Sequence, residues 1–167
     1  MDNSKIYFIE NENYSRIPDY FLRQIAILRW GYDENKLDSW ANRLKSDTFG
    51  FTSFYMLASP DLDFTKQSSK IIGFAYFCQD ENNENYWYYG DLIIHSEYRR
   101  SGIATRMIET GMIELKCRKA SKLFTYIDKD NESSILLHEK LSFIPSAKQG
   151  VINGFDKNDR IIYELTL

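Results

Sequence analysis

The chain has 167 residues, of which 43% are hydrophobic and 27% are charged, and its formal net charge is −3. This length allows one domain whose core needs neither disulfides nor metals. The slight negative charge offers no basic surface for nucleic acid. No apolar run approaches the about 20 residues that cross a bilayer. We therefore expect a single domain over residues 1–167, with no nucleic-acid partner and no membrane association.

The two cysteines and the polar start of the chain favour a cytoplasmic location. Cys78 and Cys117 are far apart, each within a predicted strand or helix, and there is no CxxC motif. Isolated cysteines of this kind indicate buried thiols in a reducing compartment. Residues 1–5 contain no apolar signal region.

The first third of the chain predicts a strand, two helices and a second strand. Residues 6–9 form a short apolar strand. Ile17-Pro18 opens an amphipathic helix that Gly31 ends. A second helix is predicted over 34–45, and a strand over 51–58.

The remaining elements alternate between strands and helices. Residues 71–77 and 86–94 predict an antiparallel pair, followed by a long helix over 102–119. A strand over 123–127 and a helix over 132–141 come next. Pro145 marks the exit from that helix, and the last two strands, 151–152 and 160–167, are expected to pair across a turn at Asn153-Gly154.

This order predicts a mixed α/β fold of the α+β type. We expect a central, mostly antiparallel sheet of about seven strands flanked by about four helices. The strands on either side of the helix 102–119 would form a right-handed crossover and be the only parallel neighbours.

A turn at residues 97–105 carries the most informative motif, Arg99-x-x-Gly102-x-Ala104. It follows an apolar strand and opens a helix, whose first N–H groups have no partners and whose dipole favours an anion. Gly102 and Ala104 let an anion approach the backbone, and Arg99 and Arg100 add positive charge. The spacing matches neither GxxxxGK[ST] nor GxGxxG. The turn therefore predicts a phosphate site of a different kind.

Two blocks together resemble the GNAT superfamily of acyl-CoA-dependent N-acetyltransferases. The turn is similar to that family's pyrophosphate loop, [Gln/Arg]-x-x-Gly-x-[Gly/Ala]. The segment 131–143 resembles a later block, Asn-x-x-Ala-x-x-x-Tyr-Glu-Lys-x-Gly-Phe. Ser134, His138 and Ser142 stand where the family usually has alanine, tyrosine and glycine. The resemblance covers residues 71–145 well and implies a GNAT-like fold.

The resemblance also implies acetyl-CoA as cosubstrate, bound between the two parallel strands. The backbone of Leu92, Ile93 and Ile94 would pair with the pantetheine arm, and Asn131 would contact the pantetheine region. The residues expected to hold the pyrophosphate are Arg99, Arg100, Ser101, Gly102, Ile103, Ala104 and Thr105. No His, Cys or Asp cluster has ligand spacing, so we expect no metal.

Two residues are candidates for the chemistry. The family often protonates the leaving thiolate with a tyrosine at the position of His138, and an imidazole can replace it. His138 otherwise contacts the cofactor or packs on its helix, and a nearby tyrosine is then the acid. Asp91, the only carboxylate in its strand, is a candidate to accept the amine proton through water. Its alternative role is a hydrogen bond to a turn or strand edge, and Tyr126 stands where some relatives carry a glutamate.

The sequence thus favours an acetyl-CoA-dependent N-acetyltransferase that acts on a primary amine by direct attack in a ternary complex. The acceptor would be a small molecule or a peptide, and the chain is compatible with a homodimer. A non-catalytic acyl-CoA-binding or sensor module of the same fold is the alternative, because His138 replaces the usual tyrosine. A nucleotide-phosphate binder is a third interpretation.

Overall fold

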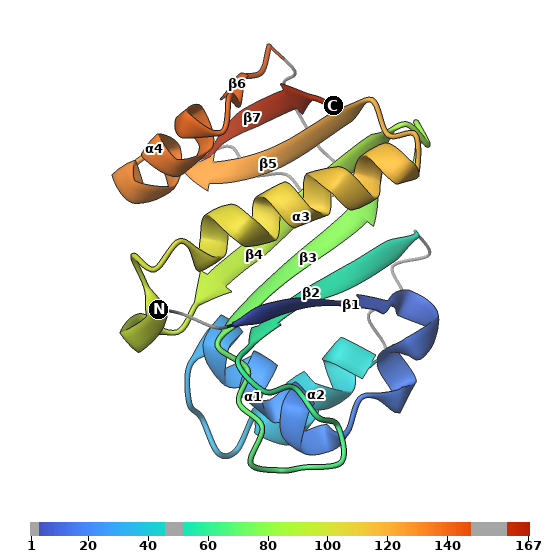
Figure 1. Ribbon diagram of the computed structural model, residues 1–167, viewed down its shortest axis with the longest axis vertical. Helices are drawn as coiled ribbons and strands as arrows, with labels where there is room; N and C mark the ends of the chain where they lie inside the picture. The colour runs from blue at the N-terminus through green and yellow to red at the C-terminus, as the bar shows by residue number, and fades with distance from the viewer. Residues whose placement is uncertain (1–3, 46–51, 148–159) are drawn as a thin grey trace.

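One mixed sheet organises the protein (Figure 1). The computed structural model describes residues 4–45, 52–147 and 160–167. The strands are β1 (Lys5–Glu10), β2 (Ser53–Ser59), β3 (Gly73–Gln79), β4 (Tyr86–Ile94), β5 (Lys122–Asp128), β6 (Ile144–Pro145) and β7 (Arg160–Thr166). The α-helices are α1 (Asp19–Trp30), α2 (Leu37–Lys45), α3 (Ile103–Cys117) and α4 (Glu132–Lys140), with 3₁₀ turns η1 (Asn11–Arg16) and η2 (Ser96–Tyr98). None of the described helices has the length and hydrophobicity needed to cross a membrane.

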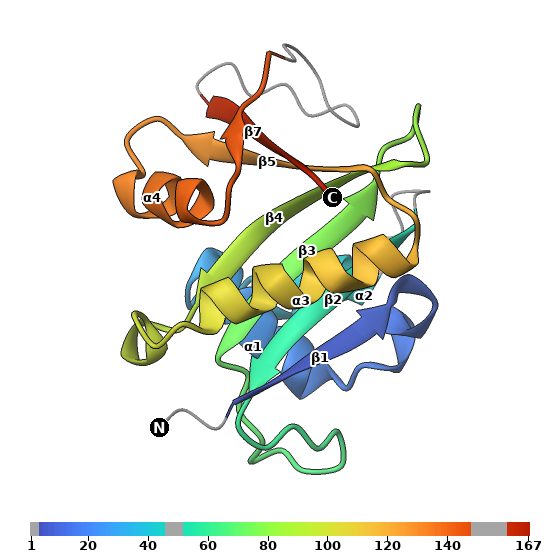
Figure 2. The ribbon, with the colours of Figure 1, turned by 45° about the horizontal axis from the view of Figure 1, so that its top comes forward.

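The sheet has the strand order β1-β2-β3-β4-β5-β7-β6. The β4–β5 pair is parallel and the other described pairs are antiparallel. Helix α3 connects β4 to β5 and lies across one face of the sheet, while α1 and α2 cover the other face (Figures 1 and 2). The predicted mixed, mostly antiparallel fold with one parallel pair is therefore confirmed.

The first two helices begin later than their sequence predicts. Pro18 is the N-cap of α1, so the helix itself starts at Asp19, and Gly31 ends it as predicted, with its N–H bonded to the Ile27 carbonyl at 2.9 Å. Helix α2 starts at Leu37 rather than at residue 34. The reason is a turn in which the Asp33 side chain accepts a hydrogen bond from the Asn35 N–H at 3.2 Å.

At the C-terminal end, helix α4 ends at Lys140, one residue before its predicted end. Ile144–Pro145 then forms the edge strand β6, which was not predicted and which pairs with Glu164 and Tyr163 of β7. A proline is accommodated there because an edge strand leaves one side of its backbone without ladder bonds. The predicted strand 151–152 and its turn at 153–154 lie outside the described residues.

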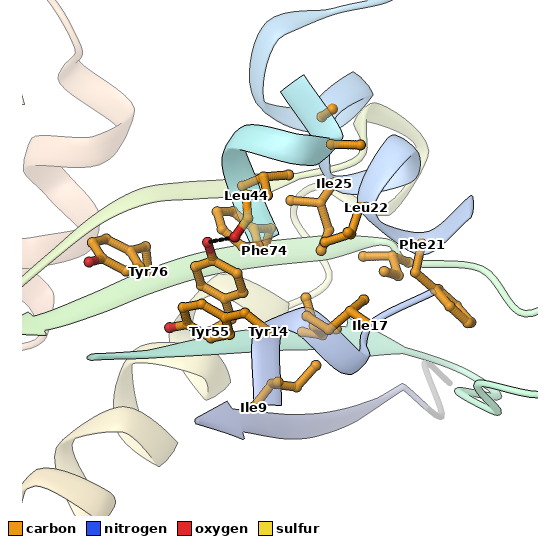
Figure 3. Packing of buried hydrophobic residues seen from close by; sticks show 14 of the residues in the cluster. Ile9, Tyr14, Ile17, Phe21, Leu22, Ile25, Leu44, Tyr55, Phe74 and Tyr76 are labelled. Atoms are coloured by element: carbon orange, nitrogen blue, oxygen red, sulfur yellow. Dashed lines mark hydrogen bonds between the residues drawn. The ribbon is translucent and has the colours of Figure 1, made fainter. Parts of the chain in front are cut away.

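The core lies on both faces of the sheet. On the α1–α2 face, the ring of Tyr14 stacks on that of Tyr55 with centroids 3.8 Å apart, and the Tyr55 hydroxyl donates to the Leu44 carbonyl at 3.0 Å (Figure 3). On the α3 face, a Cβ added at Gly111 would lie 2.6 Å from Cζ of Phe77. Only glycine therefore lets α3 pack this closely on β3.

The two cysteines differ in burial. Cys78 is buried, as predicted, but Cys117 is exposed, so the prediction of two buried thiols is wrong. Cys117 lies one helical turn after Ile113, which is itself exposed, on the outward side of α3.

Candidate functional site

The parallel strands β4 and β5 are paired over only part of their length. Their register runs from Tyr86↔Lys122 to Tyr89↔Thr125. Beyond this point, β4 continues beside β3 and β5 continues beside β7, and the two strands part (Figure 2). Within the described chain, residues 90–94 thus have no strand partner on the side of β5. This edge includes the three residues predicted to pair with a pantetheine arm.

Asp91 lies in a β-bulge at the start of this open edge. The register of β3 with β4 shifts between Phe74 and Tyr76, and Asp91 has φ 53°, in the left-handed region. Its carboxylate forms an ion pair with Arg29 of α1, and the Arg29 guanidinium lies 4.6 Å from the ring centre of Trp30. The Asp91 side chain is 34% exposed, so it is open to a ligand beside the bulge.

The predicted phosphate turn leads directly into α3. Gly102 is the N-cap with φ 82°, and no side chain caps the helix. A Cβ at Gly102 would meet nothing within 4 Å, so no neighbouring group crowds this position. Uncapped N–H groups at a helix N-terminus are suited to an anion. The turn therefore fits the diphosphate of a coenzyme.

The side chains of the predicted phosphate-binding residues serve different purposes. Arg100 is exposed, whereas Arg99 donates from Nε to the Ile94 carbonyl at 3.1 Å. The Ser101 hydroxyl donates to the Tyr98 carbonyl at 2.5 Å, and the Ile103 side chain is buried in the core. Ala104 and Thr105 are half-buried in the first turn of α3. Ile103 can therefore bind an anion only through its backbone N–H.

His138 is buried in the face of α4 that packs against the sheet. Its Nδ1 lies 2.6 Å from the Ser134 carbonyl oxygen, and its Nε2 is hydrogen-bonded to the Tyr89 hydroxyl. A carbonyl only accepts, so Nδ1 carries the proton and donates to Ser134. In the neutral ring, Nε2 then accepts from the Tyr89 hydroxyl.

The protonation state of His138 follows from its surroundings. Burial lowers the pKa of His138 below its ordinary 6.5, and the hydrogen bond to the Ser134 backbone opposes this shift only in part. The imidazole is therefore neutral near pH 7. Its Nε2 presents a lone pair rather than a proton.

Comparison with known sequences decides the family. The profile of the Acetyltransferase (GNAT) family matches residues 20–143. The chain belongs to the GNAT family of acetyltransferases. No curated protein sequence matches it.

Solved structures show the same fold at low sequence identity. An acetyltransferase from Streptococcus agalactiae is 13% identical with a TM-score of 0.70, and the alignment covers 100% of both chains. A GNAT acetyltransferase from Staphylococcus aureus is 14% identical with a TM-score of 0.64, covering 97% of this chain and 99% of that one. PaiA N-acetyltransferase from Thermoplasma acidophilum, solved in complex with coenzyme A, is 15% identical with a TM-score of 0.62, covering 98% and 99%.

In this GNAT acetyltransferase, Asn131 caps α4. Its side-chain oxygen accepts from the Ser134 N–H at 3.1 Å and from the Ser133 hydroxyl at 3.0 Å. Only its amide nitrogen is thus left to donate toward a pantetheine arm. Ser142, where the family usually has glycine, has φ 67° in the turn that ends α4.

Tyr89, the hydrogen-bond partner of His138, is a residue that sequence reasoning did not single out. Its side chain is 3% exposed, and burial raises its pKa well above the ordinary value, although a hydrogen bond with Thr125 lowers it in part. Alternation along β4 was the available signal, because Trp87 and Tyr89 share the α3 face while Tyr88 faces α1 and α2. The described residues contain no group of three or more His, Cys, Asp or Glu side chains placed to hold a metal ion.

Proposed function

We propose that this GNAT protein is an acetyl-CoA-dependent N-acetyltransferase that acetylates a primary amine by direct attack in a ternary complex. The opening between β4 and β5, which leads to the uncapped N-terminus of α3, is the observation that carries the proposal. Acetyl-CoA supplies the activated acetyl group when it is bound. The turn 99–105 would hold its pyrophosphate and the open edge at 92–94 its pantetheine amides.

The same geometry gives the direction of the bound arm. From the phosphate turn, the open edge of β4 runs back from Ile94 to Gly90 and ends at the Tyr89↔Thr125 pair. At about 3.3 Å per residue, the five steps from residue 94 to residue 89 span roughly 16 Å. The thioester end would therefore lie near the bulge at Asp91 and the last paired residues. A backbone N–H beside the bulge would stabilise the oxyanion.

An amine that arrives as ammonium must lose two protons during the reaction. The first must leave before the nitrogen can attack, and we assign its removal to Asp91, acting through water. Asp91 suits this role because it is partly exposed at the bulge, where Arg29 fixes its carboxylate. The second proton leaves after attack, while the sulfur needs one to depart as a thiol.

The acceptor would be a small molecule or a peptide amine. Release of free thiol from acetyl-CoA, measured with polyamines, aminoglycosides, amino acids and peptides, tests the activity. We expect turnover with at least one class of primary amine. Tight acetyl-CoA binding without turnover on any amine would instead favour a non-catalytic acyl-CoA-binding module.

Gly102 offers a matched pair of variants for the coenzyme site. Asn and Asp both tolerate the left-handed backbone, so Gly102→Asn and Gly102→Asp differ mainly in charge. A carboxylate about 4 Å from a phosphate is repelled by roughly 4 kcal/mol at an effective dielectric of about 20. We therefore expect Gly102→Asp to bind acetyl-CoA about 10³-fold more weakly than Gly102→Asn. Equal affinities would place the phosphates elsewhere.

A further inference from the structure

A chain of hydrogen bonds crosses three elements at the point where β4 and β5 part. Thr125 of β5 contacts the Tyr89 hydroxyl, which bonds Nε2 of His138 on α4, whose Nδ1 donates to the Ser134 carbonyl. Tyr89 and Thr125 are the last paired residues before the opening. A titratable pair thus lies at the closed end of the proposed coenzyme slot.

The direction of these hydrogen bonds suits proton uptake. Nδ1–H is fixed on a carbonyl that can only accept, which leaves the Nε2 lone pair facing the tyrosine O–H. In this state the imidazole cannot donate from Nε2. It can accept the Tyr89 proton while the Tyr89 oxygen takes another.

We propose that Tyr89 and His138 form a proton relay that carries the second amine proton to the leaving sulfur. Tyr89 is the catalytic residue of the pair, and His138 acts through it as the positioning and proton-storing residue. This inference rests on the proposed N-acetyltransferase function.

The Tyr89–His138 pair takes up one proton and releases one proton in each reaction cycle. Attack forms the C–N bond and leaves a positively charged nitrogen. The Tyr89 oxygen takes a proton from that nitrogen while the Tyr89 proton passes to Nε2 of His138. As the C–S bond breaks and the sulfur leaves with its electron pair, Tyr89 gives its proton to the sulfur and recovers one from Nε2. The products are the amide and the free thiol, and the pair returns to its starting state.

The surroundings of His138 keep the storage step reversible. Tyr89 faces the imidazole from β4 and Tyr163 faces it from β7, with the Tyr163 ring centre 6.5 Å away, and Phe143 packs edge-on at 5.2 Å. The hydrogen-bond partners of His138 among the described residues are the Tyr89 hydroxyl and the hydroxyl and carbonyl of Ser134, and none of them is charged. A stored positive charge would thus face only neutral partners, the Ser134 carbonyl at 2.6 Å and the Ser134 hydroxyl at 3.3 Å from Nδ1, and the return of the proton would be favoured.

Tyr89→Phe removes the relay hydroxyl and keeps the ring. We expect kcat to fall roughly 10²- to 10⁴-fold, the usual contribution of a positioned acid–base group. The KM for acetyl-CoA should change by less than about threefold, which is under 1 kcal/mol. Tyr163→Phe is the matched control, because Tyr163 is equally buried beside the imidazole but has no hydrogen bond to it. Its kcat should stay near wild type.

His138→Gln tests whether His138 only positions the Tyr89 hydroxyl or also takes up its proton. Its amide oxygen can accept from Tyr89 but cannot take up a proton. In the wild type, kcat should fall at low pH, where a protonated Nε2 can no longer accept. His138→Gln should lose at least tenfold in kcat and lack this acid limb. Because the residues act as a unit, the double variant should be no slower than the slower single variant.

The outcomes distinguish a failure of the relay from a failure of the proposed N-acetyltransferase function. If the wild type shows no turnover on any amine, the proposed function fails. The relay is wrong if the wild type is active and folded Tyr89→Phe keeps kcat within threefold of it. The relay is also wrong if the fall in kcat of the double variant equals the product of the falls in Tyr89→Phe and His138→Gln. ¹⁵N NMR of the histidines needs neither turnover nor a variant. A neutral ring protonated at Nδ1 supports the relay, and a proton on Nε2 at neutral pH overturns it.

Discussion

Asp91 combines an unusual backbone with a charged side chain. A non-glycine residue in the left-handed region is uncommon, and aspartate is among those that tolerate it best. The bulge places its carboxylate opposite Arg29 of α1, which holds it at the edge of the open segment of β4. The ion pair holds the carboxylate beside the bulge, and the proposed function gives the same carboxylate the role of proton acceptor. These two roles are separable by experiment.

Asp91→Asn keeps a side chain that tolerates the left-handed backbone and removes the proton acceptor. We expect kcat/KM to fall about 10²-fold at pH 7. The loss should shrink toward pH 9, because more of the acceptor amine is then already neutral. Asp38→Asn is the control, since it makes the same change in an exposed ion pair with Arg23. Unchanged kcat/KM in Asp91→Asn would leave the ion pair as the only role of Asp91.

His138 should make folding stability depend on pH. Burial lowers the pKa of His138 in the folded protein below 6.5, so the unfolded chain binds a proton first as the pH falls. Stability should therefore decrease as the pH drops through about 6.5, and this contribution should level off below the folded pKa. His138→Gln should show a shallower decrease between pH 7.5 and 5.5, measured by urea unfolding. The parent protein measured in parallel is the reference, and an identical slope in His138→Gln would contradict the neutral buried imidazole.

At the scale of elements, the end of α4 explains a preference of the family. The Phe143 N–H bonds back to the His138 carbonyl at 3.0 Å, and Ser142 before it has φ 67°. Glycine is favoured at this position because it has no Cβ to clash in the left-handed region. The chain keeps the turn with serine at a cost in stability.

Ser142→Gly should therefore stabilise the protein. The left-handed backbone costs a non-glycine residue roughly 1–2 kcal/mol, part of which is offset by the greater freedom of glycine in the unfolded chain. We expect a net gain of about 0.5–1 kcal/mol in the free energy of unfolding, measured in urea. Ser133→Gly, in the first turn of α4, should instead lose at least about 0.5–1 kcal/mol, because glycine disfavours the helix and the hydroxyl bond to the Asn131 cap is lost. A loss of stability in Ser142→Gly would mean that the serine side chain stabilises the turn.

The elements that sequence reasoning predicted well are those with a strong local period. The strand 86–94 and the helix that became α3 are examples, since apolar spacing and a glycine turn define them. The edge strand β6 was not predicted, because two residues are too few to show an alternation of apolar and polar side chains. Pro145 was instead interpreted as the point where the chain leaves helix α4. The contact between Tyr89 and His138 joins residues 49 positions apart. Only the packing of α4 on the sheet brings them together, and no local pattern encodes it.

At the scale of the whole molecule, charge does not favour the proposed ligand. The chain carries a net charge of −3, and a coenzyme with a pyrophosphate is also an anion. Attraction must therefore come from local features, namely the N-terminus of α3 and the arginines of the turn. The extended edge of β4 adds contacts that a nucleotide without a pantetheine arm cannot make. Selectivity should thus depend on the arm as well as on the phosphates.

Acetyl-CoA should accordingly raise the melting temperature more than ATP or NAD. A ligand at 100 times its Kd stabilises the folded state by about 2.7 kcal/mol. For a chain of this size, each kcal/mol raises Tm by about 2–4 °C, so the expected shift is roughly 5–10 °C. Differential scanning fluorimetry at millimolar ligand measures it, and Gly102→Asp should lose most of the shift that Gly102→Asn retains. An equal shift with ATP would assign the turn to nucleotide phosphates in general. No shift with acetyl-CoA or CoA would remove the coenzyme from the space between β4 and β5, because binding at that site must stabilise the two strands that form it.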